Sequence, residues 1–252
     1  MCNDQGARRA PLRNIVNQTP KPELETSLDK SGASVRAMFS DIAARYDFLN
    51  HLLSANRDRR WRRRAIKLLN PKTRHRVLDL CCGTGDFAIE CLHQQPKCEI
   101  IGADFAQPML QIATEKSALP FASADALRLP FRDATFDAVI DAFGVRNFEN
   151  TRAGLCEMAR VVKPAGRVLV LEFMRPTSPV LKFGFGVFFK RVLPIVGKLI
   201  SRHNAAYNYL PSSVDEFYTR REFEKLMREV GLKDVRSWDL DGGIATIFLA
   251  RK

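Results

Sequence analysis

The segment 79–86, with the sequence Asp-Leu-Cys-Cys-Gly-Thr-Gly-Asp, constrains the fold of this 252-residue chain more than any other stretch. The apolar residues 77–80 that lead into it are typical of a short buried strand, and residues 87–92 have the pattern of a helix. Gly83 and Gly85 let the backbone turn tightly between these elements and let a ligand approach closely. The free N–H groups at the start of the helix suit an anionic group of that ligand. The segment therefore predicts a cofactor site at the end of the strand.

Strand and helix patterns alternate along most of the chain. Further strands are expected at 99–104, 136–142, 167–173, 233–240 and 243–250, and further helices at 35–46, 58–69, 108–116, 151–162 and 220–230. Such alternation predicts a mostly parallel sheet with helices on both faces. The expected fold class is therefore α/β and Rossmann-like.

Two segments depart from this alternation. Residues 1–33 are polar, contain three prolines and lack periodicity, so we expect a flexible tail, with order beginning near Ser34. Residues 178–210 are apolar and basic, and they predict an inserted helical lobe. We expect residues 34–252 to form one domain, in which residues 34–70 are a helical lid.

Three acidic residues indicate which cofactor the glycine turn binds. Asp104 stands 21 residues after Gly83, at the end of the next strand, where a carboxylate accepts hydrogen bonds from both hydroxyls of a ribose. Asp79 directly precedes the turn, and its charge favours a cofactor with an ammonium and a sulfonium over a pyrophosphate. Asp125 is placed to accept a hydrogen bond from an adenine amino group, and the Ala126 N–H to donate one to a ring nitrogen. These positions favour S-adenosylmethionine.

The glycine turn alone does not exclude another cofactor. Residues 83–88 also match the Gly-x-Gly-x-x-Ala fingerprint of a nicotinamide-dependent oxidoreductase. A solvated turn is the simpler explanation of Asp125, because polar loop residues often have no ligand. The distinction between the two cofactors therefore depends on the three acids taken together.

The glycine turn, the three acids and residues 163–166 resemble the motifs of class I S-adenosylmethionine-dependent methyltransferases. From residue 35 to 252 the chain is similar, more narrowly, to the C-methyltransferases of quinone biosynthesis, which act on demethylmenaquinol and on 2-polyprenyl-6-methoxy-1,4-benzoquinol. The narrower resemblance is carried by residues 38–50, 53–54, 61, 143–147, 160–164, 172–173 and 207–214. It is most specific at Tyr46-Asp47…Asn50 and at 143–147.

This resemblance implies a seven-stranded sheet, mostly parallel with one antiparallel strand, and S-adenosylmethionine as the cofactor. It implies cofactor contacts from Gly83, Thr84 and Gly85 beside those of the acids. It also implies methyl transfer to a ring carbon of a polyprenylated quinol. Demethylmenaquinol is the expected substrate, the benzoquinol step is left open, and no metal is expected.

Three polar residues are the expected catalytic groups. Arg146 and Asn147 follow the strand that ends at residue 142, at the carboxyl edge of the sheet, where α/β proteins bind ligands. A cation and an amide there would stabilise the quinol oxygen as it becomes negatively charged. Tyr46 is expected to hydrogen-bond the cofactor or the quinol from the lid. A purely structural role in a loop or a buried helix is the alternative for each.

The formal net charge of +12 indicates an anionic partner, although many proteins are simply basic. The aromatic and basic residues of 180–203 fit a groove for a prenyl tail beside anionic lipid headgroups, and they fit a packed lobe with solvated charges equally well. The arginine-rich helix at 57–67 has the same two interpretations. We expect peripheral contact with an anionic membrane surface, and a homo-oligomer is left open.

Other functions remain as alternatives. Basic charge also suits an RNA methyltransferase, but the sequence has no appended RNA-binding module, so no nucleic-acid partner is expected. A methyltransferase for another small molecule, or an inactive assembly protein of the same fold, is also compatible with the motifs. Six cysteines without Cys-x-x-Cys spacing indicate free thiols in a reducing compartment. No apolar run has the length of a membrane span, so a cytoplasmic protein is expected, at the inner face of the bacterial membrane.

Overall fold

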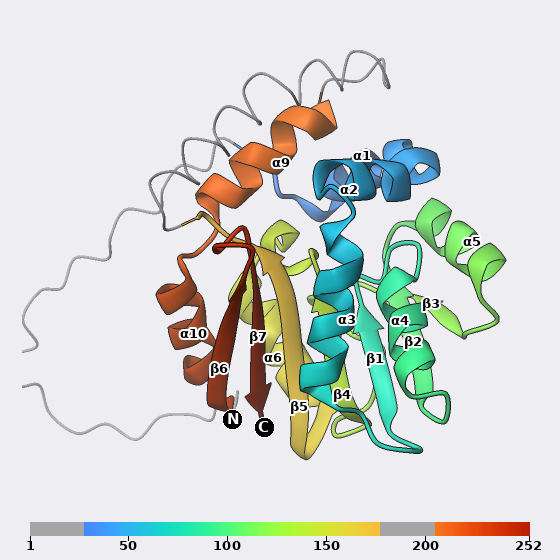
Figure 1. Cartoon of the computed structure of the whole chain (residues 1–252), viewed down its shortest axis with the longest axis vertical. Helices are drawn as coiled ribbons and strands as arrows, with labels where there is room; N and C mark the ends of the chain where they lie inside the picture. Colours follow the sequence, from blue (N-terminus) through green and yellow to red (C-terminus); the bar gives the residue numbers. More distant parts are fainter. Residues whose placement is uncertain (1–27, 177–204) are drawn as a thin grey trace, which may run out of the picture.

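A seven-stranded sheet forms the centre of the molecule (Figure 1), in a computed structural model that describes residues 28–176 and 205–252. Its strands are β1 (Arg76–Leu80), β2 (Glu99–Asp104), β3 (Phe121–Ser123), β4 (Phe136–Ala142), β5 (Val162–Phe173), β6 (Lys233–Leu240) and β7 (Ala245–Arg251). Their order is β3-β2-β1-β4-β5-β7-β6, and only the two pairs made by β7 are antiparallel. The predicted Rossmann-like sheet, mostly parallel with one antiparallel strand, is confirmed.

Helices cover both faces of the sheet and the edge at which β1, β2 and β4 end (Figure 1). The helices are α1 (Gly32–Ile42), α2 (Tyr46–Leu53), α3 (Arg57–Leu69), α4 (Asp86–Gln94), α5 (Gln107–Lys116), α6 (Thr151–Val161), α9 (Ala205–Glu216) and α10 (Arg220–Glu229), with short 3-10 helices η1 (Ala43–Arg45) and η2 (Val145–Asn147). Of these, α1, α2 and α9 lie together above the strand ends, and α1 packs against α5 and α9.

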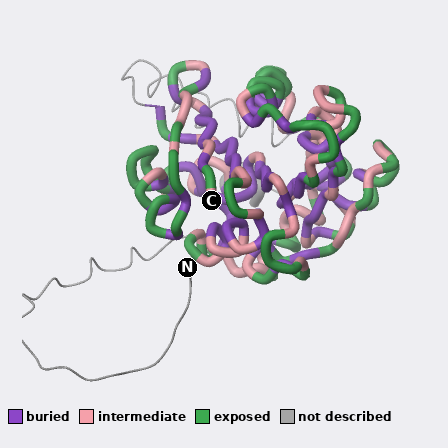
Figure 2. The backbone as a smooth tube through the Cα atoms, turned by 90° about the horizontal axis from the view of Figure 1, so that it is seen from below, coloured by how far each residue is buried: buried purple, intermediate pink, exposed green. Residues whose placement is uncertain are grey.

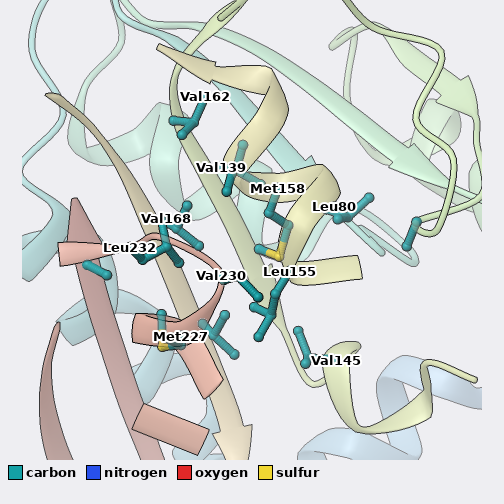
Figure 3. Close-up of a cluster of buried hydrophobic side chains, with 14 of the residues drawn as sticks. Leu80, Val139, Val145, Leu155, Met158, Val162, Val168, Met227, Val230 and Leu232 are labelled. Atoms are coloured by element: carbon teal, nitrogen blue, oxygen red, sulfur yellow. The ribbon is translucent and has the colours of Figure 1, made fainter. Parts of the chain in front are cut away.

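Two apolar cores hold the layers together, one on each face of the sheet. On one face, Leu155 and Met158 of α6 meet Met227 of α10 across the sheet residues Val139 and Val168 (Figure 3). On the other face, α3 and α4 bury a second cluster against the sheet. Full burial of each such side chain contributes roughly 1.5–3 kcal/mol. The tube in Figure 2 shows these buried segments at the centre of the molecule.

The position of β1 between two covered faces of the sheet explains why its sequence is apolar at successive positions. Leu78 and Leu80 belong to the core under α6 and α10, whereas Val77, directly before Leu78, belongs to the core under α3 and α4. Successive side chains of a strand point to opposite faces, so a strand covered on both sides buries each of them. Asp79 is the exception in this strand, since it is a buried carboxylate on an otherwise apolar element.

The structure differs from the predicted elements at several boundaries. Helix α1 begins at Gly32, and its N-cap is Ser31. The start predicted at Ser34 therefore lies three residues too late. The single helix expected over 35–46 is divided into α1, η1 and the first residue of α2. The short strand β3 had no strand predicted at its position. It is only three residues long, and its place in the sheet comes from pairing with β2.

Strand β5 also begins earlier than residue 167. Val162 already pairs with Phe136, and the register then shifts before Arg167 pairs with Ala138. Ala165 in the intervening bend has a φ of +60°, a conformation that favours glycine. The lobe predicted at 178–210 lies largely outside the described residues; its last six residues, 205–210, belong to α9.

Candidate active site

The glycine turn between β1 and α4 adopts the strained backbone that its sequence predicts. Cys81, Gly83 and Gly85 have φ values of +52°, +53° and +85°. This left-handed region is open to glycine at no steric cost but costs roughly 1–2 kcal/mol for other residues. The turn also brings its backbone close to the next strand, because the Cys82 N–H donates to the Ala103 carbonyl at 3.1 Å. Strand β2 thereby delivers its last residue, Asp104, to the turn.

Asp104 connects the turn to the end of β2. Its Oδ2 accepts the Gly83 N–H at 2.9 Å, and its Oδ1 accepts the Ala106 N–H at 2.8 Å. Burial raises the pKa of Asp104, although these backbone N–H groups oppose the shift. Each carboxylate oxygen accepts more than one hydrogen bond, so both can still receive hydroxyl groups from a ligand. The geometry suits the ribose contact expected from the sequence.

Asp79 is buried directly beneath the turn. Its Oδ2 accepts the Ala88 N–H at 2.9 Å, but its Oδ1 has no hydrogen-bond partner among the described residues. Burial raises the pKa of Asp79 to about 8. An unsatisfied buried carboxylate is unfavourable without a cation, so the orphaned oxygen fits a ligand that carries an ammonium group.

A cleft of about 760 Å³ opens beside the turn. It is lined by Lys30, Gly32, Val35, Phe39, Tyr46, Cys81, Gly83, Asp104, Phe105, Met109, Ala124, Asp125, Ala126, Leu127, Ala142, Phe143, Gly144, Asn147, Phe148 and Glu149. This size is typical of small-molecule sites. Residues of α1 and α2 form the lid and walls of the cleft. Residues at the ends of β1, β2 and β4 form its floor.

The cleft brings six of the ten predicted site residues together. These are Tyr46, Gly83, Asp104, Asp125, Ala126 and Asn147. The other four, Asp79, Thr84, Gly85 and Arg146, lie within two residues of a lining residue in the sequence but are not in the wall. Asp125 is exposed, and its Oδ1 accepts the Leu127 N–H at 2.8 Å, which holds the turn that presents Ala126.

Arg146 is buried behind the cleft wall rather than within it. Its Nη1 donates to Glu172 Oε1 at 2.8 Å and to the Phe143 carbonyl at 2.5 Å, and its Nε donates to Ser213 Oγ at 3.4 Å. Burial is the largest influence and would lower the pKa of Arg146, but Glu172, Tyr46 and Tyr209 together outweigh it, so the pKa lies above its usual value. The guanidinium therefore stays charged and connects η2, β5 and α9.

Asn147 presents an amide in the cleft. Its Nδ2 donates to the Phe143 carbonyl at 3.2 Å, and its Oδ1 has no partner among the described residues. Phe143 itself has a φ of +66°, which is unusual for a bulky residue and marks a strained turn after β4. The same carbonyl thus receives hydrogen bonds from both Arg146 and Asn147, and these fix the strained backbone.

Tyr46 lies between the lid and the glycine turn. Burial raises its pKa, and a hydrogen bond with Asn50 opposes that shift. A Cβ added at Gly83 would meet the Tyr46 ring at 3.5 Å, so the ring packs over the turn. The motif residues Tyr46 and Asn50 are thereby explained as partners within α2.

Asp47 ties the lid to the cofactor turn. Its Oδ1 accepts the Thr84 hydroxyl at 2.5 Å, and its Oδ2 forms an ion pair with Lys116 at 2.9 Å. Lys116 also pairs with Asp86 at the start of α4. The hydroxyl of Thr84, expected to contact the cofactor, is therefore directed at the lid.

Lys30 and Lys116 are polar site residues that the sequence analysis did not select. Lys30 lay in the segment interpreted as tail, although Asp29 and Ser31 beside it are residues typical of a helix N-cap, a signal that could have moved the start of order. Lys116 ends α5 without any local motif, and only packing of the lid reveals its role.

One group of side chains has the composition of a metal site. Ligand atoms of His51, Asp58 and Asp86 lie within 4.8 Å of one another. However, the Arg62 guanidinium pairs with Asp58 and also lies 3.6 Å from Asp86. Arg62 is thus the cation that neutralises this group, and it connects α3 with the start of α4.

Solved structures of methyltransferases share this fold. An S-adenosylmethionine-dependent methyltransferase from Thermotoga maritima has a TM-score of 0.64 at 18% identity, covering 86% of this chain and 99% of that one. Phosphoethanolamine N-methyltransferase 2 of Haemonchus contortus, solved with S-adenosyl-L-methionine, has a TM-score of 0.55 at 17% identity, covering 74% of this chain and 50% of that one. These likenesses show that the chain has the fold of S-adenosylmethionine-dependent methyltransferases.

Sequence comparison identifies the family within that class. The model of the ubiE/COQ5 methyltransferase family matches residues 26–252, so the chain belongs to this family. The ubiquinone/menaquinone biosynthesis C-methyltransferase UbiE of Geobacter sulfurreducens is 46% identical over 89% of this chain and 91% of its own length. The demethylmenaquinone methyltransferase of Thermus thermophilus is 47% identical over 83% of this chain and 97% of its own length. The expected enzyme class, an S-adenosylmethionine-dependent C-methyltransferase, is confirmed.

Proposed function

We propose that this protein methylates a ring carbon of a polyprenylated quinol and converts demethylmenaquinol to menaquinol. The observation that carries the proposal is the strained turn 143–147, which aims the Asn147 amide into the same cleft that Asp104 and Gly83 line. The names of the relatives from Geobacter sulfurreducens and Thermus thermophilus support the same reaction. The benzoquinol step of ubiquinone synthesis is a second candidate, supported by the first of these names.

The cofactor side of the proposed reaction is built from the β1 and β2 ends. Bound S-adenosylmethionine supplies a methyl group on a positively charged sulfonium. Asp104 would hold its ribose, Asp79 would face its ammonium, and Asp125 with Ala126 would hold its adenine. Gly83 and Gly85 leave room for it beside the turn. The orphaned Oδ1 of Asp79 is the observation that fits this assignment.

The substrate side must make a ring carbon nucleophilic. That carbon gains electron density when the neighbouring quinol oxygen loses its proton, so stabilisation of that oxygen lowers the barrier. Asn147 would donate to it through the second N–H of Nδ2, since the other is given to the Phe143 carbonyl, and Tyr46 would contribute its hydroxyl from elsewhere in the wall. Arg146 contributes from behind, because its guanidinium holds the Phe143 carbonyl that also positions Asn147. As the carbon–carbon bond forms, the sulfur–methyl bond breaks and the ring proton is released.

Membrane contact is part of the same proposal, because a polyprenylated substrate resides in a lipid bilayer. Phe48 and Leu52 lie one helical turn apart on α2 and are 56% and 42% exposed. Exposed Arg45 lies just before α2, and Arg59 and Arg60 lie near the start of α3. An apolar ridge flanked by cations suits the surface of an anionic membrane. No helix in the two described ranges is long and apolar enough to cross a membrane.

The substrate is tested by the quinones of a bacterial deletion strain. Mass spectrometry should detect accumulated demethylmenaquinone, and a plasmid carrying the wild-type gene should restore menaquinone. An Asn147→Ala gene serves as the matched variant and should not restore it. An accumulated 2-polyprenyl-6-methoxy-1,4-benzoquinone would point to the ubiquinone step instead, and an unchanged quinone profile would refute the proposal.

The membrane surface is tested with purified protein and vesicles. We expect cosedimentation with vesicles that contain anionic lipid and much less with neutral vesicles, and Phe48→Ser with Leu52→Ser should reduce it. A salt titration of binding to RNA separates the nucleic-acid alternative, which predicts a steep salt dependence. Equal binding of wild type and the double variant to anionic vesicles would contradict the assignment of this surface.

A further inference from the structure

Lys30 is the one cation among the described residues that line the cleft. Its ammonium lies 3.7 Å from Glu216 Oε2 at the end of α9, and only 16% of its side chain is exposed. Arg146 and Glu172 are close enough to affect its charge. Lys30 belongs to no sequence motif, and it is not one of the expected catalytic groups Arg146, Asn147 and Tyr46.

The segment around Lys30 is held by specific contacts. Asp29 Oδ1 accepts the Ser31 N–H at 2.9 Å, and its other oxygen accepts the Ser34 hydroxyl. Ser31 in turn caps the first turn of α1. These bonds fix the chain direction between the cap and the helix, so Lys30 is presented to the cleft between α1 and α9 instead of to solvent.

We propose that the Lys30 ammonium binds the negatively charged quinol oxygen and stabilises it during methyl transfer. This inference rests on the proposed function. The cleft wall contains the carboxylates of Asp104, Asp125 and Glu149, so an anionic oxygen needs a local cation to enter it. Arg146 cannot serve fully, since its Nη1 is already bonded to Glu172 and Phe143 behind the wall. The ion pair with Glu216 holds the Lys30 ammonium and leaves Lys30 in the cleft wall.

The electrostatic surroundings of Lys30 suit this role. Burial is the main cause that lowers its pKa below the usual value; Glu216 opposes the shift, Arg146 adds to it, and Glu172 opposes it. A lysine of lowered pKa is a stronger hydrogen-bond acid than a solvated one. It also shares a proton more readily with a phenolic oxygen, whose pKa is ordinarily about 10. Glu216, Arg146 and Glu172 are the titratable groups that act on it.

The inference is tested by steady-state kinetics on full-length protein with a short-chain demethylmenaquinol and S-adenosylmethionine. We expect Lys30→Ala to lower kcat/KM for the quinol by about 100-fold, the size typical of a lost oxyanion donor. Lys30→Arg should retain much more activity, because it keeps the positive charge. Exposed Lys225 on α10 provides the control, and Lys225→Ala should match wild type.

Two further measurements separate catalysis from folding. Calorimetric affinity for S-adenosylmethionine should be unchanged in Lys30→Ala, and millimolar ethylammonium should partly restore its rate, which a structural defect would not allow. In Lys30→Arg the alkaline limb of the kcat/KM profile should move to higher pH. If wild type is active and Lys30→Ala matches it, or loses activity without rescue by the amine, the inference is overturned. An inactive wild type would instead refute the proposed function itself.

Discussion

The two sides of the site that we assign to the cofactor and to the substrate carry opposite charges and are built in different ways. The cofactor side consists of carboxylates at strand ends, Asp79 and Asp104, held by backbone N–H groups of the adjacent turn. The substrate side has the cations Lys30 and Arg146, held by carboxylates from β5 and α9. The residues of the substrate side come from segments far apart in the sequence.

This difference fits the charges of the reaction. A sulfonium is stabilised by acids, whereas an ionised quinol oxygen is stabilised by a cation, and the two must be neighbours without neutralising each other's protein partners. The uncharged residues Gly83, Tyr46 and Asn147 also line the cleft. Mutations on the cofactor side should therefore impair cofactor binding, and mutations on the substrate side should impair the reaction of the quinol, each without affecting the other.

The largest effect is expected for Asp104→Ala on the cofactor side. The change removes the ribose acceptor and leaves the Gly83 and Ala106 N–H groups without their partner, so affinity for S-adenosylmethionine should fall by about 100-fold or more. Calorimetry measures it, and thermal melting shows whether the variant folds. Asp125→Ala is the matched control, since that carboxylate is exposed, and its affinity should fall by less than about 10-fold. Equal losses would contradict the assignment.

Asn147→Ala should affect the substrate side alone. Loss of the amide should lower kcat by roughly 10- to 100-fold, while affinity for S-adenosylmethionine stays within about 2-fold of wild type. Asn147→Asp is an informative partner, because a negative charge at the same position should slow the reaction more than alanine does. A variant that binds the cofactor poorly would show instead that Asn147 belongs to the other side.

Asp79→Asn should separate affinity from stability. The folded-state pKa of about 8 lies above the ordinary value of 3.8, so the folded protein binds more protons than the unfolded chain between these values. Stability of the cofactor-free protein should therefore fall as pH rises through this window, by at most about 1.4 kcal/mol per pH unit. Asp79→Asn should remove that dependence and raise the Tm at pH 8, yet weaken cofactor binding by about 10-fold.

Proton release on cofactor binding tests whether the ammonium lies beside Asp79. An ammonium bound beside the carboxyl favours its ionised form, so calorimetry at pH 7 in buffers of different ionisation enthalpy should detect protons released on cofactor binding. The release should disappear in Asp79→Asn. If wild type releases no protons, the ammonium does not face this residue.

The smallest effect is expected for Asp47→Ala, which loosens the connection between the two sides. The substitution removes the acceptor of Thr84 and one partner of Lys116, so the lid should close less completely over both ligands. We expect the KM values for cofactor and quinol to rise together by about 3- to 10-fold, with kcat changed less. Thr84→Val removes only the hydroxyl and should reproduce part of the effect. A change confined to one KM would mean that the contact serves one side only.

The conformation of the glycine turn and its contact with Asp104 could be predicted from sequence because their determinants are local. Gly83, Gly85 and Asp104 lie within one strand–turn–helix–strand unit, where left-handed backbone and strand ends leave a sequence signature. The sequence suggested Tyr46 only through resemblance to a family, whereas it suggested Asn147 also by its place after the strand that ends at residue 142. It also placed Arg146 and Thr84 at the site without showing that one points behind the wall and the other toward Asp47.

The sequence by itself determined the α/β class, the glycine turn, its three acids and the enzyme class. These follow from periodicity and from short-range spacing, which the chain cannot vary without losing the turn. Only the tertiary structure decided that Lys30 enters the cleft, that Lys116 secures the lid, and that Arg146 is paired with Glu172. The physical reason is that a charge has no fixed role until packing determines its neighbours and its exposure to water.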